Sequence, residues 1–262
     1  MADSADDLVG KFREPLRLAV SNLPRPVKLR AENALSGFDR ARRLLDVDRE
    51  MASFRAITAE EEAAAALFRS FQLRGYPGAE LLSLKDHNHK AALGPFIQAV
   101  RHQLATTGWF TMTVQLNSSA PSLAISLPMS QFGMDHPDNL HLALVQPLGV
   151  VSSFPGIEPD DHFDRSLKVV AGSRQVNKLI RSEANARNHL LYASDSSLPR
   201  SAATLASIET RQRRAEIALL LSIAVLQTDE LQAMAAQCLR AFLKVLAQLK
   251  KKPLLPSKGQ KG

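Results

Sequence analysis

The stretch "PRPVKLRAENALSGFDRARRLLD" (residues 24–46) places an apolar side chain at every third or fourth position. These apolar residues are Val27, Ala31, Ala34, Leu35, Phe38, Ala41 and Leu45. Their spacing matches the 3.6-residue period of an α-helix and gathers them on one face. A helix with one apolar face must bury that face against another element, so this stretch predicts a body of packed helices.

Apolar residues recur at the same helical spacing after residue 46. "DVD" (46–48) ends the first helix, and Asp48 can cap the next one by accepting a hydrogen bond from its first exposed N–H groups. The second helix, at about 49–74, ends at the turn sequence "GYPG" (75–78). A third helix is expected at about 86–105, where Pro95 removes a backbone donor and predicts a kink or a break. Later helices are expected at about 166–192, 201–226 and 229–250.

The middle of the chain has a different pattern. Three segments predict short antiparallel strands, namely "WFTMTVQLN" (109–117), "SLAISLP" (122–128) and "NLHLALVQP" (139–147). Three short strands alone are barely stable, so we expect them to pack on the helices. Residues 148–165 are rich in Pro, Gly and Asp and are expected to form a loop. The predicted fold is mainly α, a helical bundle with a small antiparallel β insert, and α+β overall.

The 262 residues fit one helical domain at 24–249, which includes the strand-rich insert at about 109–147. An N-terminal segment (1–23) precedes this domain and a basic tail (250–262), expected to be disordered, follows it. The apolar fraction of 45% and the charged fraction of 23% are typical of a soluble globular protein. No run of about 18 apolar residues and no signal-peptide pattern occur, so no membrane association is predicted. The single cysteine, Cys238, excludes an internal disulfide framework and suits a reducing cytoplasm, where we expect the protein to reside.

The formal net charge of +7 is concentrated at the C-terminal end. "KKKPLLPSKGQKG" (250–262) holds five lysines and no acidic residue, so the body of the chain is only weakly basic. Contact of this tail with RNA or another anionic surface remains one interpretation, and a solubilising tail is the other.

The sequence contains no phosphate-binding G-x-x-x-x-G-K-[ST], no dinucleotide-binding G-x-G-x-x-G after a strand, no G-x-S-x-G and no H-E-x-x-H. Nucleotide hydrolysis, redox chemistry with a dinucleotide cofactor and serine hydrolysis are therefore not expected. The sequence predicts no cofactor.

Two predicted helices carry charges on their apolar faces, where an unpaired charge is costly to bury. Glu61, in "AEEEAAAALF", shares a face with Phe54, Ile57, Ala64, Phe68 and Phe71, whereas Glu60 and Glu62 are expected in solvent. Glu183 and Arg187 share a face with Val176, Ile180, Leu190 and Leu191. Their i, i+4 spacing suits an ion pair within the helix. A second interpretation is a hydrogen-bonded polar network between two helices. Its members would be Glu61, Glu183, Arg187, His189 and Tyr192.

"KDHNHK" (85–90) opens the third predicted helix. Asp86 is expected to be the N-cap, with His87 and His89 exposed in the first turn. On a helix, residues i and i+2 point to different sides, so these two histidines form a metal pair only on a strand or loop. His162, in the acidic segment "DDHFD" (160–164), is a remote third ligand. We therefore expect no metal site.

Three segments of this chain, taken together, resemble the HEPN superfamily and its abortive-infection AbiV-like branch. They are "AEEEAAAALF" (59–68), "DHNHK" (86–90) and "ARNHLLYASDSSLP" (186–199), which stand in the order of that branch. "RNHLLY" is similar to the Arg-Asn-x-Leu-(Leu/Val)-His signature of the superfamily, many members of which are metal-independent ribonucleases. This chain has Tyr192 at the position of the final histidine, and the strand-rich insert is not part of a minimal HEPN bundle.

The resemblance implies a phage-defence toxin that acts on RNA or translation, through attack of a ribose 2′-OH on the adjacent phosphate. Arg187 would neutralise the phosphate, Asn188 would position oxygen atoms, and Tyr192 would take the place of the histidine of the signature. His189, or His87 or His89 from the third helix, would be the general base or acid. Glu61 and Glu183 would orient Arg187, and Lys90 completes the "DHNHK" segment. The family often pools two sites across a homodimer, and the helices at 209–249 would offer an interface or simply core.

An alternative from another class is a helical interaction module without catalysis. In this interpretation, Glu61, Arg187 and Tyr192 form a buried network that fixes the helix register. The strand-rich insert or the basic tail would then bind a protein partner.

Overall fold

The computed structural model describes residues 12–106, 113–128, 141–144, 146–149, 159–172, 175–192, 201 and 203–250. In these ranges the helices are α2 (Arg13–Ser21), α3 (Arg25–Leu44), α4 (Arg49–Leu73), the 3₁₀ helix η1 (Ala79–Leu81), α5 (His87–Thr106), α6 (Pro159–Ala171), α7 (Val176–Leu191), α8 (Leu205–Leu226) and α9 (Ala233–Lys250). The strands are β1 (Thr113–Asn117), β2 (Ser122–Pro128) and β3 (His141–Leu144). The predicted fold class, mainly α with a small antiparallel β insert, is confirmed.

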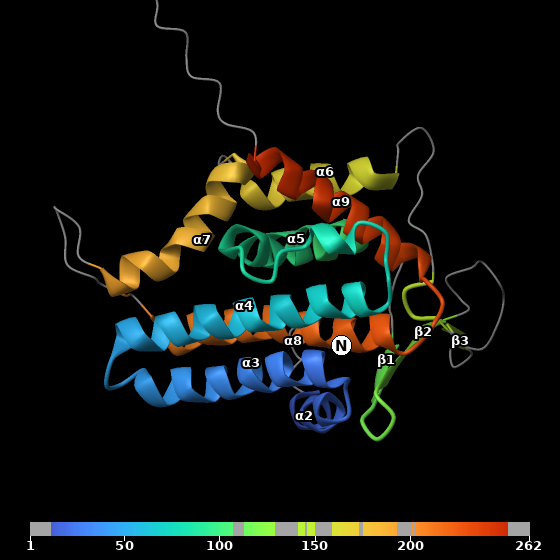
Figure 1. Cartoon of the computed structure of the whole chain (residues 1–262), viewed down its shortest axis with the longest axis horizontal. Helices are drawn as coiled ribbons and strands as arrows, with labels where there is room; N and C mark the ends of the chain where they lie inside the picture. Colours follow the sequence, from blue (N-terminus) through green and yellow to red (C-terminus); the bar gives the residue numbers. More distant parts are fainter. Residues whose placement is uncertain are drawn as a thin grey trace, which may run out of the picture.

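The helices α3 and α4 form an antiparallel hairpin (Figure 1). Asp48 caps α4 as predicted, because its Oδ1 accepts a hydrogen bond of 2.9 Å from the backbone N–H of Met51. The two helices approach closely at Gly37, where an added Cβ would lie 2.8 Å from Cβ of Ala59. The buried apolar residues of the 24–46 stretch face this contact, so its helical period does predict the packing.

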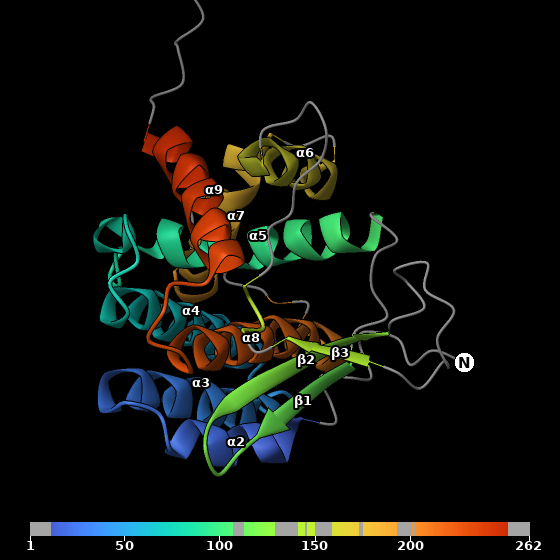
Figure 2. The same cartoon turned by 90° about the vertical axis from the view of Figure 1, so that its right-hand side faces the viewer.

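The helices stack in layers that both views show (Figures 1 and 2). Helices α2 and α3 form one outer layer, α4 and α8 lie next to it, and α5 follows. Helices α6, α7 and α9 cover the far side of α5, and α7 also reaches α4. The N-terminal segment thus contributes α2, which buries Leu16, Ala19 and Val20 in the main core.

The strands form one antiparallel sheet in the order β1-β2-β3, with Leu116 opposite Leu123 and Ile125 opposite Leu144. The sheet lies at one end of the bundle, against α8 and α2 (Figure 2). Gln227, at the end of α8, fixes it there. Its Oε1 accepts from the N–H of Leu123 at 2.7 Å, and its Nε2 donates to the Leu123 carbonyl at 3.0 Å. This side chain binds β2 as a neighbouring strand would.

Two local predictions need correction. Pro95 does not break α5, which is one continuous helix from His87 to Thr106. Loss of one backbone hydrogen bond is offset there by packing, since Leu93, Phe96 and Ile97 around the proline are all buried. The stretch 148–165 is not loop throughout, because α6 begins at Pro159. Proline is favoured at a first helical position, where its missing N–H is not needed.

The predicted helix at 166–192 is two helices. Gly172 separates them with φ of +60°, a left-handed conformation that glycine adopts without strain. Its N–H donates to the Lys168 and Val169 carbonyls, which closes the end of α6. In the described ranges, no helix combines the length and the apolar character needed to cross a bilayer. The basic tail after residue 250 lies outside these ranges.

Candidate functional site

The side chains of Glu61, His87 and Lys90 meet where α4 packs on the start of α5. Nδ1 of His87 lies 2.9 and 2.8 Å from the two carboxylate oxygens of Glu61, and Nζ of Lys90 lies 2.9 Å from Oε2. Glu61 is 6% exposed and Lys90 is also buried, whereas the His87 side chain is 38% exposed. A buried carboxylate therefore holds a half-exposed imidazole and a buried ammonium group.

The local sequence explains this meeting. Glu61 lies on the buried face of α4, as its place among Phe and Ala residues predicts. His87 and Lys90 are three residues apart in the first turn of α5 and so project from the same side of that helix. Asp86 accepts a 2.8 Å hydrogen bond from the N–H of Asn88 and thereby caps the start of α5, as predicted.

His89 does not lie in solvent, contrary to expectation. It is buried, and its Nδ1 accepts a hydrogen bond of 3.1 Å from the N–H of Ser83. Its Nε2 lies 3.5 Å from Oδ2 of Asp86. The ring holds the loop before α5 because a buried backbone N–H needs an acceptor. His87 and His89 thus take different partners, as residues i and i+2 of a helix do.

A second group of charges adjoins the first through Glu60. Nη1 of Arg211 lies 2.6 Å from Oε2 of Glu60, and Nη2 of Arg214 donates to the same oxygen at 3.1 Å. Nη2 of Arg211 also donates to Oε2 of Glu183 at 3.1 Å. Burial favours the neutral form of Arg211, but Glu60 and Glu183 outweigh it and raise the pKa of its guanidinium. Glu60 is thus an interior ion-pair partner instead of a solvated residue.

We call the combined set of Glu60, Glu61, Glu183, His87, Lys90, Arg211 and Arg214 the polar seam. A cavity of about 10 Å³ lies within it, lined by Glu60, Glu61, Lys90, Glu183, Arg211, Ile57 and Ala91. This volume holds about one water molecule. Helices α4, α5, α7 and α8 each contribute to the polar seam, which is therefore an interior junction of four helices.

Gly94 makes room for the polar seam. A Cβ at this position would lie 2.9 Å from Oε1 of Glu60 and 3.2 Å from Nη1 of Arg214. Those distances are shorter than ordinary van der Waals contact, so only glycine lets α5 approach the Glu60–Arg214 ion pair as closely as it does. A glycine inside a predicted helix was the sequence signal for this close approach.

The residues of α7 to which the resemblance assigns a role fall into two groups, according to whether they lie in or beside the polar seam or outside it. Glu183 is in the polar seam but bonds Arg211, so it is not oriented toward Arg187 as expected. Arg187 is half-buried one turn further on, and its Nε is buried without a hydrogen-bond partner. Glu61 does not orient Arg187 either, since its oxygens face His87 and Lys90.

Asn188, His189 and Tyr192 lie outside the polar seam. All three are exposed, and Tyr192 is 69% exposed just beyond the last residue of α7. The structure therefore joins the first two segments of the resemblance through Glu61, His87 and Lys90. From α7 it brings Glu183, which precedes the third segment (186–199), into the seam.

Sequence reasoning missed Arg211 and Arg214. They belong to "RQRRAE" (211–216), a run that reads as a solvated helix surface. The available signal was their i, i+3 spacing, which continues into the buried positions Ala218 and Leu219 of α8.

Among the described residues, no three His, Cys, Asp or Glu side chains are grouped so that they could hold a metal ion. The side chain of His162, the remote third ligand considered above, lies outside the described residues.

No family model, curated protein or solved structure matches this chain.

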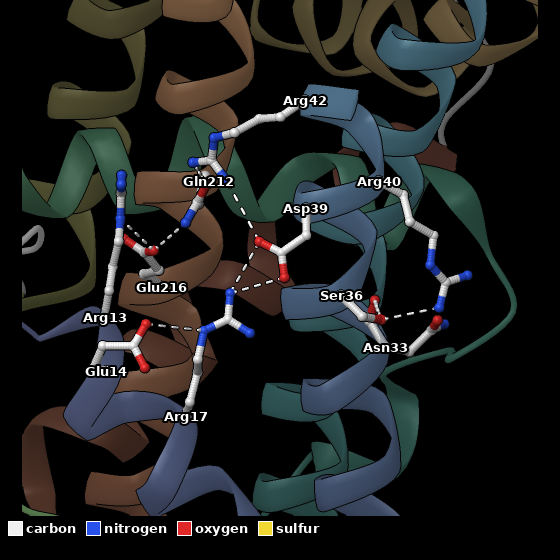
Figure 3. Close-up of polar contacts among 10 residues, drawn as sticks. All are labelled: Arg13, Glu14, Arg17, Asn33, Ser36, Asp39, Arg40, Arg42, Gln212 and Glu216. Atoms are coloured by element: carbon white, nitrogen blue, oxygen red, sulfur yellow. Dashed lines mark hydrogen bonds and ion pairs between the residues drawn. The ribbon is translucent and has the colours of Figure 1, made fainter. Parts of the chain in front are cut away.

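A second buried carboxylate, Glu216, lies on α8 where this helix faces α2 and α3 (Figure 3). Nε of Arg13 lies 3.2 Å from its Oε1, and Gln212 donates to the same oxygen and accepts from Arg42. Beside it, Nη2 of Arg17 contacts both oxygens of Asp39 at 3.0 and 2.9 Å. This cluster fastens α2 to the bundle and leaves no imidazole for proton transfer, so we regard it as structural.

Proposed function

We propose that this protein acts on RNA as a metal-independent endoribonuclease of the abortive-infection type, with His87 as its general base. The observation that carries the proposal is the pairing of the half-exposed His87 ring with the buried carboxylate of Glu61 at 2.8 Å. A carboxylate behind one ring nitrogen fixes the orientation of an imidazole. The ring edge that faces away from Glu61 then remains for a substrate.

The fixed position of Glu61 supports this role. Lys90 holds the carboxylate from a second side, and both residues are buried, so neither side chain is free to reorient. An imidazole exchanges protons near neutral pH, which suits abstraction of a ribose 2′-OH proton. In the proposed reaction, the O2′–P bond forms while the P–O5′ bond breaks. The proton taken by His87 returns to the departing 5′ oxygen, so no metal or other reactant is required.

Arg187 is the proposed phosphate ligand. It follows Glu183 by one helical turn on α7, a helix that packs on both α4 and α5. Its buried Nε has no hydrogen-bond partner, and guanidinium groups bind phosphate through two parallel N–H donors. Lys90 and Arg211 are already engaged with carboxylates, so Arg187 is the seam-adjacent cation with unused donor capacity.

A second candidate function is a non-catalytic interaction module. The cavity in the polar seam has room for only about one water molecule, and Arg214 bonds Glu60 inside the bundle. A fully paired interior network of this kind fixes helix register. In this alternative His87 is one more member of that network, and the protein acts by binding a partner.

Induced expression with analysis of total RNA tests the proposal. We expect growth arrest and cleaved RNA with the wild type, and loss of both with His87→Asn and with Arg187→Met. His189→Ala, which changes an exposed imidazole on α7, is the matched control and should behave as the wild type. Since the Nε of Arg187 has no partner, Arg187→Met should change the free energy of unfolding by only about 0.5 kcal/mol.

Purified protein completes the test. The wild type should cleave a defined RNA in the presence of a chelator, because the proposed reaction uses no metal. An intact RNA after incubation with folded wild type, or equal cleavage by His87→Asn, would contradict the nuclease and favour the interaction module.

A further inference from the structure

One side of α7 presents a line of polar side chains to solvent at the outside of the bundle (Figure 1). Its members follow one another at intervals of three or four residues, which keeps them on one face of the helix. At a rise of about 1.5 Å per residue, the line extends over about 20 Å. We call it the α7 stripe, and its members are Lys178, Arg181, Asn185, Asn188 and Tyr192, the C-cap of the helix.

The α7 stripe carries positive charge and no negative charge. Glu183 is the only acidic residue of α7, and it is half-buried and bonded to Arg211. The other exposed residues between positions 178 and 192 are Ser182, His189 and Leu191, which lie beside the stripe. An anionic partner is therefore attracted to this face and meets no acidic side chain on it.

The basic end of the stripe adjoins the C-terminal end of α9. Nη2 of Arg181 donates to the Leu249 carbonyl at 3.1 Å, and Nδ2 of Asn177 donates to the Gln248 carbonyl at 3.4 Å. A guanidinium group has five N–H donors, so this one bond leaves others for a phosphate. Residues 250–252 are all lysine, and the sequence thus adds further positive charge after Leu249.

The other end of the stripe is aromatic. Tyr192 is 69% exposed, and it is the only aromatic residue among the large apolar side chains that the described ranges expose. An exposed aromatic ring is a surface on which an unpaired base stacks. Asn185 and Asn188 stand between this ring and the two cations, and a side-chain amide both donates to and accepts from the edge of a base.

We propose that the α7 stripe is a docking surface for single-stranded RNA, with phosphates at Lys178 and Arg181 and a base stacked on Tyr192. Two cations alone suit any polyanion, whereas an aromatic ring in line with two amides suits unpaired bases. In a duplex the bases stack on one another and are not available to a tyrosine ring. The choice of RNA over single-stranded DNA rests on the proposed ribonuclease, although no member of the stripe belongs to the polar seam.

Binding of a fluorescent single-stranded RNA of about 12 nucleotides to the purified full chain tests the proposal. The probe carries 2′-O-methyl groups, which block the proposed cleavage, so its anisotropy reports binding alone. Lys178→Gln/Arg181→Gln should weaken binding roughly tenfold and reduce the slope of log Kd against log salt by about 1.4, because each phosphate contact to a single strand contributes about 0.7. The matched control Arg40→Gln/Arg43→Gln removes two exposed arginines from α3, in the opposite outer layer, and should bind as the wild type does.

The stacking assignment has its own comparison. Tyr192→Ser should weaken binding by roughly fivefold or more, the loss expected for one stacked base, whereas Tyr192→Phe keeps the ring and should bind as the wild type does. His189→Ala, beside the stripe, should also bind normally. Circular dichroism shows whether each variant is folded. If the double variant of Lys178 and Arg181 unfolds, Lys178→Gln alone should still reduce the salt slope by about 0.7.

An unchanged Kd and salt slope in the folded stripe variants would overturn the docking surface, as would an equal loss in the α3 control. Equal binding of a duplex would overturn the assignment to an unpaired strand, and equal competition by polyglutamate would assign the stripe to an acidic protein instead. The ribonuclease is tested separately. Binding through the stripe without cleavage of ordinary RNA would overturn only the ribonuclease, and cleavage together with normal binding by the stripe variants would overturn only the docking surface.

Discussion

Nζ of Lys90 lies 2.9 Å from Oε2 of Glu61, and the two side chains are only 9% and 8% exposed. The pair joins α5 to α4 in the interior, where an isolated charge of either sign is strongly unfavourable. His87 approaches the same carboxylate from the protein surface. The orientation of the proposed general base therefore depends on a buried ion pair that substrate does not contact.

Removal of the lysine charge should destabilise the fold. Lys90→Met leaves Glu61 buried without its cation, and we expect the free energy of unfolding to fall by about 3 kcal/mol. The double variant Lys90→Met/Glu61→Gln should be less destabilised than the sum of the two single variants, because it leaves no unpaired buried charge. Urea unfolding followed by circular dichroism measures all three. The exposed Lys85→Met is the matched control, and an equal effect of both lysine variants would show that the ion pair contributes nothing.

Much of the fold could be predicted from periodicity, because apolar residues recur at helical spacing along most of the helices. The apolar stripes placed α3, α4, α5, α8 and α9 within a few residues of their observed bounds. The helical period of apolar residues could not predict where α6 begins, because a segment rich in Pro, Gly and Asp has the composition of a loop. Tertiary contacts determine that part of it is helical. Of the kink or break expected at Pro95, the break did not occur, because packing on both sides of α5 outweighs a local backbone preference.

The candidate site was predicted in part. Glu61 and Glu183 were identified because a charge among apolar residues at helical spacing must be buried and therefore paired. Their partners could not be identified, since sequence spacing within one helix carries no information about which other helix packs there. Glu183 had Arg187 available at i+4, yet it bonds Arg211 from α8. Arg211 itself was not identified, because nothing in "RQRRAE" (211–216) shows which of its charges faces another helix.

Gly94→Ala should test how tightly α5 packs on the polar seam. Alanine in a helix interior normally stabilises by about 1 kcal/mol relative to glycine. Here the new Cβ would lie 2.9 Å from Oε1 of Glu60, so we expect Gly94→Ala to destabilise the protein instead. In the Glu60→Ala background the same substitution should be less destabilising, because the carboxylate at 2.9 Å is gone and only the guanidinium of Arg214, at 3.2 Å, remains close. Thermal unfolding of the wild type, the two single variants and the double variant tests this prediction. Stabilisation by Gly94→Ala in the wild-type background would contradict the close approach.

The buried carboxylate of Glu216 should make stability depend on pH. Glu216 is 1% exposed, and its Oε2 is buried without a hydrogen-bond partner. Burial raises the pKa of its carboxyl above the ordinary 4.5, although Gln212 and Arg13 act in the opposite direction. The folded state thus binds this proton more tightly than the unfolded state. Its contribution to stability is complete below about pH 4.5 and is lost as the pH rises through the raised pKa.

Glu216→Gln replaces the carboxyl with a neutral group of the same shape and removes this pH dependence. At pH 7.5 the variant should be more stable than the wild type, because it buries no charge at this position. The difference should shrink as the pH falls towards 4.5, because the folded wild type binds this proton more tightly than the unfolded chain. All other ionisable groups are the same in both proteins, so their contributions cancel in the comparison. Glu14→Gln, at an exposed carboxylate of the same cluster, is the control and should stay within about 0.5 kcal/mol of the wild type. A stability difference between Glu216→Gln and the wild type that is constant from pH 4.5 to pH 7.5 would mean that Arg13 and Gln212 stabilise the ionised carboxylate fully despite its burial.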